Sequence, residues 1–341
     1  MSERKLATIR RVVDLRPIEG ADKIELAIVD GWQTVVQKGA FKVGDPAIYF
    51  EIDSFLPADP RFAFLKERCL KVIYNKPGYR LKTIRLKKML SQGLLMPMSE
   101  FPEVGTQSIG SDVTEQLGVV KYESPLPTCL VALAKGNFPS FLRKTDQERI
   151  QNCVQLVQGK DMLYEITEKL NGTSATFYMK DKVIGVCSRN LDLKESVNSA
   201  YWIIYHAEHI KDKLEFLGRN IAIQGEIVGP SICGNDYGLH MLRYYIFDVY
   251  DIDLHRLLIP SERMALLDEM AKSGYVSLHV PVIAQEKFHS IDDSLKLATG
   301  RSIINPNVRK EGIVYKSISL VNYEVSSFKV LNNEHLLEEV D

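Results

Sequence analysis

The sequence predicts two domains, a small all-β domain followed by a larger α+β domain. The chain has 341 residues, which is more than one typical domain contains. Short β-branched and aromatic runs separated by turn residues occupy residues 5–120, whereas strands and helices mix from residue 160 onward. Prolines near 125 and 139 mark the change between the two patterns. We therefore expect a first domain over residues 1–125, a linker over 126–144 and a second domain over 145–341.

The first domain has the pattern of a small barrel or sandwich. We expect strands over residues 6–9, 24–29, 34–36 and 47–52. Turn signals separate them at Glu19-Gly20, Asp30-Gly31, Lys38-Gly39 and Gly44-Asp45. Several short strands at this spacing are typical of small closed β folds.

Residues 79–88 form a further expected strand, which is strongly basic. Alternate side chains of a strand face opposite sides, so Ile84 and Leu86 would face a core while Arg85 and Lys87 face outward. These charges, together with Lys88, either contact phosphate groups or protect the solvated edge of a sheet. The chemistry of the second domain favours phosphate contact.

The second domain is expected to begin with a helix over residues 145–152. Thr145 is a suitable N-cap for it, and Glu148 occupies the capping-box position. Two further helices are expected over 198–217 and 260–272. Strands are expected over residues 163–168, 173–179, 182–187, 220–228, 244–250, 312–317 and 324–330.

The composition is that of an ordinary soluble globular protein. Hydrophobic residues make up 45% of the chain and charged residues 26%, and the net charge is −1. That balance argues against a nucleic-acid coat protein but permits an enzyme with a local basic groove. No run of about 18 apolar residues occurs, and residues 1–11 lack the apolar core of a signal peptide. We expect a cytoplasmic or nuclear protein that is neither secreted nor bound to a membrane.

The cysteines and histidines form no metal-binding motif. Five widely spaced cysteines without a CxxC pair indicate reduced thiols rather than a structural zinc site. They are Cys69, Cys129, Cys153, Cys187 and Cys233. His206 and His209 form an HxxH pair without further ligands, so we expect one face of a helix there.

Lys169 is the candidate nucleophile. It ends an expected strand and enters a Leu-Asn-Gly turn, which would project its side chain from a rigid edge, while Gly172 would allow close approach of backbone to a ligand. A lysine that attacks phosphorus must be deprotonated or desolvated when it reacts. Taken alone, Lys-x-Asn-Gly is a weak signal that favours an ordinary hairpin turn.

Five later segments favour the interpretation of Lys169 as a nucleophile over that of an ordinary turn. They supply a basic loop, two carboxylates at strands, an aromatic strand and a basic residue on the last strand. The segments are Ser188-Arg189-Asn190, Gly225-Glu226, residues 244–249, Lys310-Glu311-Gly312 and Phe328-Lys329. A nucleophilic lysine with ribose contacts, an adenine stacker, carboxylates for a metal and a phosphate-binding lysine is the set that nucleotidyl transfer requires.

In order and spacing these segments resemble the motifs of the covalent nucleotidyltransferases, which include ATP-dependent polynucleotide ligases and mRNA capping enzymes. Motif I, Lys-x-Asp/Asn-Gly, is matched by Lys169 to Gly172, and motif Ia by the Ser-Arg-Asn loop. The Gly-Glu element follows, then motif III at residues 245–248, motif IV at 311–314 and motif V at 328–329. The resemblance covers roughly residues 145–341.

Details of the motifs resemble the RNA ligases in particular. Asn171, the Ser-Arg-Asn loop and the run from Gly229 to Tyr237 are similar to the RNA ligase 2-like branch. Residues 18–25, 36–39 and 43–45 resemble an OB fold of the tRNA-binding type. An OB module before the transferase domain resembles RNA ligase family 5. The implied fold is an N-terminal all-β OB barrel followed by an α+β nucleotidyltransferase domain, ATP-grasp-like and built from antiparallel sheets.

The resemblance implies an ATP-dependent RNA ligase that joins a 3′-OH to a 5′-phosphate, on nicks bridged by a template strand. Lys169 would take AMP from ATP and release pyrophosphate. AMP would then pass to the RNA 5′-phosphate, and the 3′-OH would displace it. The implied cofactors are ATP and Mg²⁺ or Mn²⁺, the partner is RNA, and the enzyme is expected to act as a monomer.

The resemblance also implies roles for single residues. Lys169, Glu226, Glu311 and Lys329 would be catalytic. Glu311 and Glu226 would hold the metal through water. Phe247, or Tyr245 on the same strand face, would stack on adenine. ATP contacts are expected from Glu168, Asn171, Gly172, Arg189, Glu226, Val314, Lys316, Lys329 and, on the leaving phosphates, Arg149. RNA contacts are expected from Arg85, Lys87 and Lys88.

Motif V departs from the pattern of the family. It usually carries two basic residues as Lys-x-Lys, but Ser327 occupies the first position here. Either Lys316 supplies the missing charge from the neighbouring strand, or the second phosphate contact is weaker. We favour Lys316.

Two alternative functions remain. A DNA ligase or capping enzyme usually places its OB domain after the transferase domain, whereas here about a dozen residues follow motif V. A non-catalytic RNA-binding protein would use Arg85, Lys87 and Lys88 but form no covalent adduct. The nucleotidyltransferase motifs favour the RNA ligase.

Overall fold

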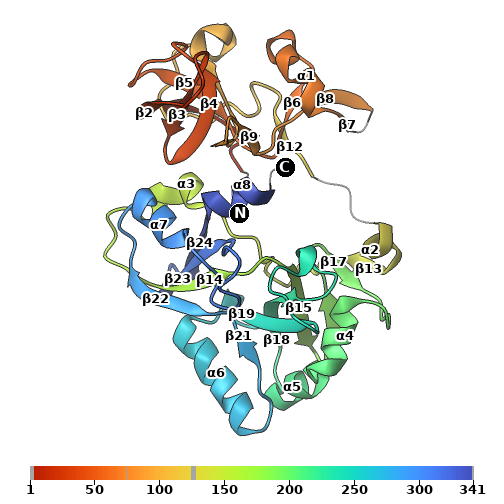
Figure 1. Cartoon of the computed structure of the whole chain (residues 1–341). Coiled ribbons are helices and arrows are strands. Elements are labelled where there is room, and N and C mark those ends of the chain that lie inside the picture. Colours follow the sequence, from red (N-terminus) through yellow and green to blue (C-terminus); the bar gives the residue numbers. More distant parts are fainter. Residues whose placement is uncertain (1–3, 74, 124–127, 340–341) are drawn as a thin grey trace. The chain divides into compact units, whose positions relative to one another are not determined.

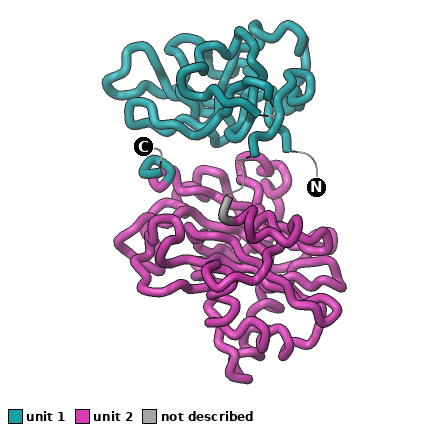
Figure 2. The backbone as a smooth tube through the Cα atoms, turned by 90° about the vertical axis from the view of Figure 1, so that its right-hand side faces the viewer, with its two compact units in different colours: residues 1–125, 336–341 teal, residues 126–335 magenta. Residues whose placement is uncertain are grey.

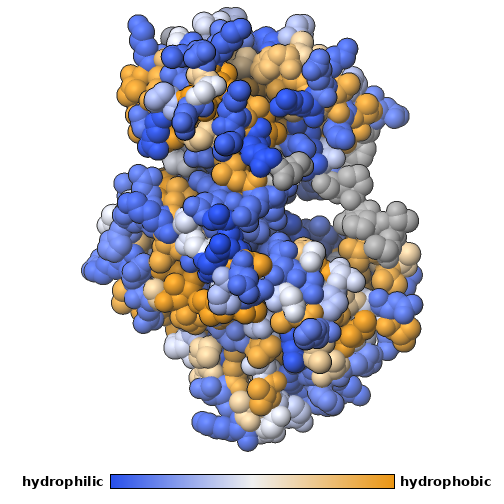
Figure 3. Space-filling model, viewed as in Figure 1, coloured by the Kyte–Doolittle hydropathy of each residue, from blue (hydrophilic) through white to orange (hydrophobic). Residues whose placement is uncertain are grey.

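The computed structural model describes residues 4–73, 75–123 and 128–339. The chain forms two compact units, one of Met1–Pro125 with Leu336–Asp341 and the other of Leu126–His335 (Figure 2). Among the described residues, no helix is long and apolar enough to cross a membrane. On the face shown in Figure 3, hydrophilic and hydrophobic side chains are interspersed over both units.

The first unit consists of short antiparallel strands. The sheets have the orders β1-β5-β11, β2-β3-β4, β10-β9 and β12-β6-β8-β7 (Figure 1). Apolar side chains from these strands form two buried clusters, one around Phe50 and Phe62 and one around Trp32 and Tyr49. The strands are β1 (Ala7–Arg11), β2 (Asp14–Pro17), β3 (Ile24–Val29), β4 (Trp32–Gln37), β5 (Pro46–Phe50), β6 (Ser54–Pro57), β7 (Leu70–Ile73), β8 (Lys76–Arg80), β9 (Ile84–Leu86), β10 (Met89–Ser91), β11 (Leu94–Pro97) and β12 (Val120–Lys121). The helical turns are η1 (Pro60–Leu65), α1 (Lys66–Cys69), η2 (Met98–Glu100) and η3 (Pro102–Val104).

The single strand expected over residues 79–88 is wrong. The segment is divided into the end of β8 and the short strand β9, and Lys87-Lys88 forms the two-residue turn between β9 and β10. Both lysines have positive φ, 47° and 64°, which is the backbone of a tight hairpin turn. The alternation still holds within β9, because Ile84 and Leu86 are half-buried and Arg85 is exposed.

The second unit contains two antiparallel sheets. An eight-stranded sheet has the order β13-β17-β16-β15-β18-β19-β20, with β21 beside β19, and a four-stranded sheet has the order β22-β14-β23-β24. The first sheet comprises β13 (Ala134–Asn137), β15 (Thr173–Lys180), β16 (Val183–Cys187), β17 (Leu191–Leu193), β18 (Ile221–Val228), β19 (Arg243–Asp251), β20 (Arg256–Leu257) and β21 (Leu278–His279). The second comprises β14 (Leu163–Lys169), β22 (Val282–Lys287), β23 (Gly312–Val321) and β24 (Glu324–Leu331).

Helices cover one face of each sheet. An apolar cluster joins the large sheet to α4 (Ala200–Ala207), α5 (Ile210–Leu217) and α6 (Pro260–Lys272), and another joins the small sheet to α3 (Ile150–Cys153) and α7 (Ile291–Ala298) (Figure 1). The single helix expected over 198–217 is two helices, because His209 between them has a left-handed φ of 50°. The remaining helices are α2 (Thr128–Ala132), η4 (Val154–Leu156), η5 (Cys233–Asn235) and α8 (Asn333–Glu339).

Residues 126–152 differ most from expectation. The expected linker contributes β13, which pairs with β17 in the large sheet. The helix expected from Thr145 is wrong, because α3 begins only at Ile150 and residues 143–148 have no helical turn. Instead of capping a helix, the Thr145 hydroxyl lies 2.8 Å from that of Ser174 on β15, and Glu148 O accepts a hydrogen bond from Lys329 N on β24. This extended segment therefore connects the two sheets.

Buried ion pairs also connect the two sheets. Lys316 Nζ on β23 lies 2.8 Å from Asp248 Oδ1 on β19, and the same nitrogen donates to Phe247 O at 2.5 Å. Arg263 of α6 pairs with Glu165 of β14 and donates to His279 Nε2 on β21. Removing one partner of such a pair leaves an uncompensated buried charge, which costs about 3–5 kcal/mol. These contacts fix the relative position of the strands on which the candidate site residues lie.

Gly225 allows β18 and β19 to approach closely beside the candidate carboxylate Glu226. A Cβ atom at Gly225 would lie 2.5 Å from Tyr245 O and from a ring carbon of Tyr244. We predict that Gly225→Ala lowers the free energy of unfolding by about 1–3 kcal/mol through overpacking. Urea unfolding would measure this. Gly136→Ala is the matched control, because nothing lies within 4 Å of its Cβ position; equal losses in both variants would contradict the explanation.

Candidate active site

A pocket of about 350 Å³ contains most of the residues predicted from the sequence. Its walls come from the end of β14, the start of β15, and strands β18, β19, β23 and β24, so both sheets of the second unit contribute. Eleven of the predicted nucleotide-site residues line it: Glu168, Lys169, Asn171, Gly172, Arg189, Glu226, Phe247, Glu311, Val314, Lys316 and Lys329. Tyr245 and Arg149 are not part of its lining.

Lys169 is the last residue of β14 and forms an ion pair inside the pocket. Its Nζ donates to Glu311 Oε2 at 2.6 Å. The register of the small sheet produces this contact, since Lys169 pairs with Gly312, the residue that follows Glu311. Burial lowers the pKa of Lys169, but the nearby carboxylates of Glu311 and Glu226 outweigh it and raise the pKa above its usual value. The lysine is therefore held as an ammonium ion in this state.

Glu226 is the second carboxylate of the pocket. Burial raises its pKa to about 7, although the positive charge of Lys169 acts in the opposite direction. Gly172 makes the approach of the motif I turn to this strand possible, because a Cβ there would lie 2.4 Å from Ile227 O and 2.8 Å from Glu226 Cγ. A larger residue at 172 would push the nucleophile's turn away from the carboxylate.

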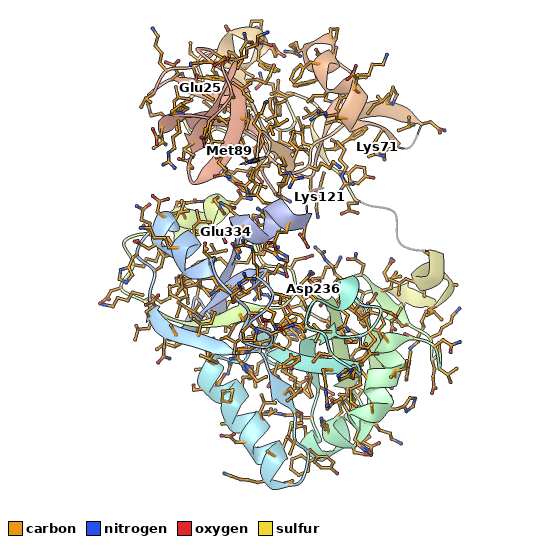
Figure 4. All side chains as sticks on the ribbon, in the orientation of Figure 1. Glu25, Lys71, Met89, Lys121, Asp236 and Glu334 are labelled. Carbon is orange, nitrogen blue, oxygen red and sulfur yellow. The ribbon has the colours of Figure 1, made fainter. Side chains whose placement is uncertain are left out.

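The turn after Lys169 is anchored by the loop that follows β18. Asn171 N donates to the Tyr237 hydroxyl at 2.8 Å, and Asn171 Nδ2 donates to Asp236 Oδ2 at 2.8 Å. Figure 4 labels Asp236 on this loop. The predicted role of Asn171 as a nucleotide contact is thus accompanied by a structural role, which is to fix the turn that presents Lys169.

Part of the pocket wall is apolar. Phe247 and Val314 line it together with Val280, whereas Tyr245 does not line it. Tyr245 and Phe247 both pack against the apolar cluster formed around Leu170. The Lys316 ammonium lies 5.3 Å from the centroid of the Phe247 ring and fixes that strand through its backbone carbonyl.

Glu168 contributes a polar group to the pocket wall. Its carboxylate is buried, and Oε2 accepts a hydrogen bond from Ile303 N at 2.8 Å. Burial raises the pKa of this carboxyl group. Oε1 is also buried and has no hydrogen-bond partner among the described residues.

Lys329 on β24 is a basic residue of the pocket and lies directly across the strand ladder from Val314. Burial and the charges of Lys169 and Arg149 lower the pKa of Lys329 to about 8. Within the described part of the chain, no carboxylate lies within ion-pair distance of Lys329, whereas Lys169 and Lys316 each have one. Arg149 forms a backbone bridge with Lys329. An anionic ligand would complement the charge of Lys329.

Lys316 does not offer a free positive charge in place of the basic residue expected at position 327. Lys316 lines the pocket, but its ammonium group is buried and already paired with Asp248. Burial lowers its pKa, with Asp248 acting against that shift. Ser327 donates a hydrogen bond to Gln147 Oε1 at 2.5 Å. Of Lys316 and Lys329, Lys329 is therefore the one without an acidic partner among the described residues.

The segment before α3 contributes pocket residues that the sequence reasoning missed. Thr145, Asp146 and Gln147 all line the pocket, and Asp146 forms an ion pair with Arg189 at its mouth. They were missed because the Thr-x-x-Glu pattern was interpreted as a helix start. The extended conformation of this segment depends on its pairing with β24. A local sequence pattern contains no information about that tertiary contact.

The carboxylates suit a metal that arrives with a phosphate ligand. Glu226 and Glu311 lie in one pocket, and the charge of Glu311 contributes to raising the pKa of Glu226. No group of three or more His, Cys, Asp or Glu residues among the described positions could hold a metal alone. Mg²⁺ is commonly bound by one or two carboxylates together with substrate phosphates and water, and this donor set fits that pattern.

Comparisons with known proteins agree with the geometry. A family profile of the OB-fold domain matches residues 6–98, and a profile of RNA ligase matches residues 163–331. No curated protein sequence matches the chain significantly. The OB-fold match confirms the fold expected for the first domain, and the second match confirms an RNA ligase domain with antiparallel sheets after it.

Solved structures of an RNA ligase from Naegleria gruberi are similar over the whole length. A lysine-to-alanine mutant with ATP and Mn is 42% identical, with a TM-score of 0.86, and the match covers 98% of this chain and 99% of that one. A glutamate-to-alanine mutant with AMP and Mn is 43% identical, with the same TM-score and coverage. A structure of the Naegleria gruberi RNA ligase with PPi is 43% identical, with a TM-score of 0.84 and the same coverage. With a motif I lysine in a two-sheet pocket and an OB-fold domain before it, this chain belongs to the RNA ligase family.

Proposed function

We propose that this protein seals RNA ends, joining a 3′-OH to a 5′-phosphate at nicks bridged by a template strand. The observation that carries the proposal is the pocket in which Lys169 contacts Glu311 while Lys329 has no acidic partner. ATP is the proposed AMP donor and Mn²⁺ or Mg²⁺ the metal, which agrees with the ATP and Mn in the Naegleria structures. We also propose that the enzyme acts as a monomer.

The first step is the formation of lysyl-AMP. The Lys169 Nζ lone pair forms a bond to the ATP α-phosphorus, the bond from that phosphorus to the bridging oxygen breaks, and pyrophosphate leaves. The resting ammonium must first lose a proton. Burial favours the neutral amine, and only the negative charges of Glu311 and Glu226 oppose it. A ligand that neutralises the charges of Glu311 and Glu226 would therefore favour the neutral amine of Lys169.

Glu311 and Glu226 are the residues that would hold the metal, directly or through water. A bound divalent cation supplies positive charge that neutralises phosphate oxygens and lowers the pKa of a nearby amine. Lys329 would bind the α-phosphate and stabilise the negative charge that develops on its oxygens. Arg149, beside Lys329, would reach toward the leaving phosphates.

The base and ribose contacts follow from the remaining walls. Phe247 would stack on one face of adenine and Val314 would contact the other. The unpartnered Oε1 of Glu168 would accept a hydrogen bond from a base amino group. Arg189 would contact the ribose after leaving Asp146, and Glu226 would order the same region.

The later steps use the same groups on RNA. The 5′-phosphate of RNA would attack lysyl-AMP and release Lys169, giving an RNA-adenylate. The 3′-OH would then attack the 5′-phosphorus and release AMP, with Lys329 again beside the reacting phosphate. The first domain is proposed to hold the RNA, through Arg85, Lys87 and Lys88 among others.

We predict that ATP labelled at the α-phosphate, with Mn²⁺ or Mg²⁺, transfers label to the wild-type protein and that Lys169→Ala abolishes the transfer. The label should survive a denaturing gel, because it is a covalent phosphoramidate. Lys160→Ala changes an exposed lysine outside the pocket and is the matched control. Label on the Lys169→Ala protein would exclude the proposed nucleophile.

The same preparation distinguishes the candidate substrates. A nicked duplex with an RNA 3′-OH strand should be sealed, and one with a DNA 3′-OH strand should be sealed poorly. Equal sealing of both would favour a DNA ligase. An RNA-binding protein without catalysis would give neither label nor product.

The pKa of Lys329 predicts how nucleotide affinity changes with pH. Lys329 is a cation below about pH 8 and becomes neutral above it. Binding of a non-hydrolysable ATP analogue should therefore weaken by about tenfold from pH 7 to pH 9, because the charged fraction of a group with this pKa falls from about nine-tenths to about one-tenth. Calorimetric titration at several pH values measures this. Lys329→Arg should retain its affinity at pH 9, because arginine stays charged; the same decline in that variant would assign the effect to another group.

The two aromatic candidates give different expected results. Phe247→Ala should raise the KM for ATP by roughly 5–100-fold, because loss of stacking on a base costs about 1–3 kcal/mol. Tyr245→Ala should change KM much less, since Tyr245 lies outside the pocket lining. Steady-state adenylylation kinetics would test both. A larger effect at Tyr245 would reverse the assignment.

A further inference from the structure

Gln147 is a pocket residue that the proposed reaction steps do not use. It lies on the extended segment before α3 and lines the pocket together with Lys329. Its Oε1 accepts a hydrogen bond from the Ser327 hydroxyl at 2.5 Å. The other half of the amide, Nε2, carries two N–H donors. Within the described part of the chain Nε2 has no hydrogen-bond partner, so the pocket wall contains an unused donor.

The register of β23 and β24 places this donor beside Lys329. Ser327 and Lys329 are two residues apart on β24, so their side chains lie on the same face of the strand. They pair with Lys316 and Val314 on β23, which line the pocket as Lys329 does. This face of the small sheet therefore faces the pocket. Gln147 lies over the same face, because its amide is bonded to Ser327.

Both sheets of the second unit hold the segment that carries Gln147. On one side, Glu148 O accepts a hydrogen bond from Lys329 N at 2.8 Å. On the other side, the Thr145 hydroxyl lies 2.8 Å from that of Ser174 on β15. The hydrogen bond to Oε1 then orders the side chain itself. A donor that is ordered before its ligand arrives loses less conformational entropy when the ligand binds.

The charges around the amide indicate the kind of ligand atom that it would contact. Lys329 has no carboxylate within ion-pair distance among the described residues. Asp146, the acidic neighbour of Gln147 in the chain, is paired with Arg189. A free N–H donor beside an ammonium group complements an anion, whose oxygen atoms accept several hydrogen bonds. In a pocket that takes ATP, this anion is a phosphate group.

We propose that Gln147 donates a hydrogen bond from Nε2 to an oxygen of the α-phosphate of the nucleotide, and that Ser327 is a positioning residue that orients the amide. The inference rests on the proposed function, in which Lys329 contacts the same phosphate. One ammonium group and one ordered neutral amide would then bind the phosphate together. Serine at position 327 orients a donor without adding a second positive charge beside Lys329.

The test compares the binding of AMP and of adenosine to the full-length protein, by competition against a fluorescent ATP analogue. Gln147→Leu should weaken AMP binding by roughly 10–100-fold, which is the contribution typical of a hydrogen bond to a charged group. Adenosine affinity should stay unchanged, because adenosine has no phosphate, and this also shows that the pocket is folded. Unchanged AMP affinity, or an equal loss for adenosine, would overturn the proposal.

Gln147→Glu separates hydrogen bonding from side-chain shape. Its carboxylate still accepts the hydrogen bond from Ser327, but at neutral pH it offers no donor and repels phosphate. AMP binding should therefore weaken at least as much as in Gln147→Leu, and wild-type AMP affinity in this variant would contradict the donor role. Gln285→Leu is the matched control, because it changes an exposed glutamine on β22 outside the pocket.

A double-mutant cycle tests the positioning role of Ser327. Ser327→Ala should weaken AMP binding by a smaller factor than Gln147→Leu does, because the amide remains but is no longer held. In the Gln147→Leu background, Ser327→Ala should have no further effect, since the two residues then share one interaction. Additive losses would show that they act independently and would exclude the positioning role.

Covalent labelling by ATP separates this inference from the proposed function. Gln147→Leu should still label Lys169, with a raised KM for ATP. If the wild type takes no label, the proposed nucleophile is wrong, but the comparison of AMP with adenosine still decides whether Gln147 contacts a phosphate. A wild type that takes label but binds AMP no more tightly than adenosine would overturn the inference alone.

Discussion

The contact between Lys169 and Glu311 is the constraint on which the rest of the second unit depends. Burial of the amine favours the neutral form that a nucleophile needs, while the two carboxylates favour the ammonium ion. In the resting pocket the Lys169 amine is therefore protonated. Compensation of the negative charges of Glu311 and Glu226 would favour its neutral, nucleophilic form. In the proposed function, a metal bound with ATP phosphates would compensate the charge of these carboxylates, and the loss of the proton from Lys169 would therefore be linked to the binding of ATP.

That contact requires two sheets to stay in register. Lys169 and Glu311 lie at neighbouring positions of the small sheet, whereas Glu226 and Phe247 lie on the large one. The Lys316–Asp248 pair crosses between the sheets beneath the pocket, and the Arg263–Glu165 pair repeats the connection through α6. Hydrophobic contacts alone tolerate small shifts, but a buried hydrogen-bonded ion pair has one favourable geometry. In this unit the buried charges therefore contribute more to position than to stability.

Much of this arrangement could be predicted from residues alone, and the exceptions have a common cause. The central strands have strong period-2 or fully apolar patterns, and the expected helix over 260–272 coincides with α6. The motifs placed the pocket residues on the ends of those strands. Thr145, the turn at Lys87 and the break at His209 were missed because tertiary pairing or a left-handed residue decides their conformation. A local pattern such as Thr-x-x-Glu describes a helix start only where no neighbouring strand competes for the same backbone groups.

Ser327 and Lys329 differ in how they meet their surroundings in the pocket. Ser327 donates a hydrogen bond to Gln147, and Lys316 on the neighbouring strand is paired with Asp248. Burial and the charges of Lys169 and Arg149 lower the pKa of Lys329. In the proposed first step, loss of the proton from Lys169 would remove one of those repulsions and favour the charged form of Lys329. A lysine at 327 would add to the repulsion on Lys329, whereas the serine adds no charge.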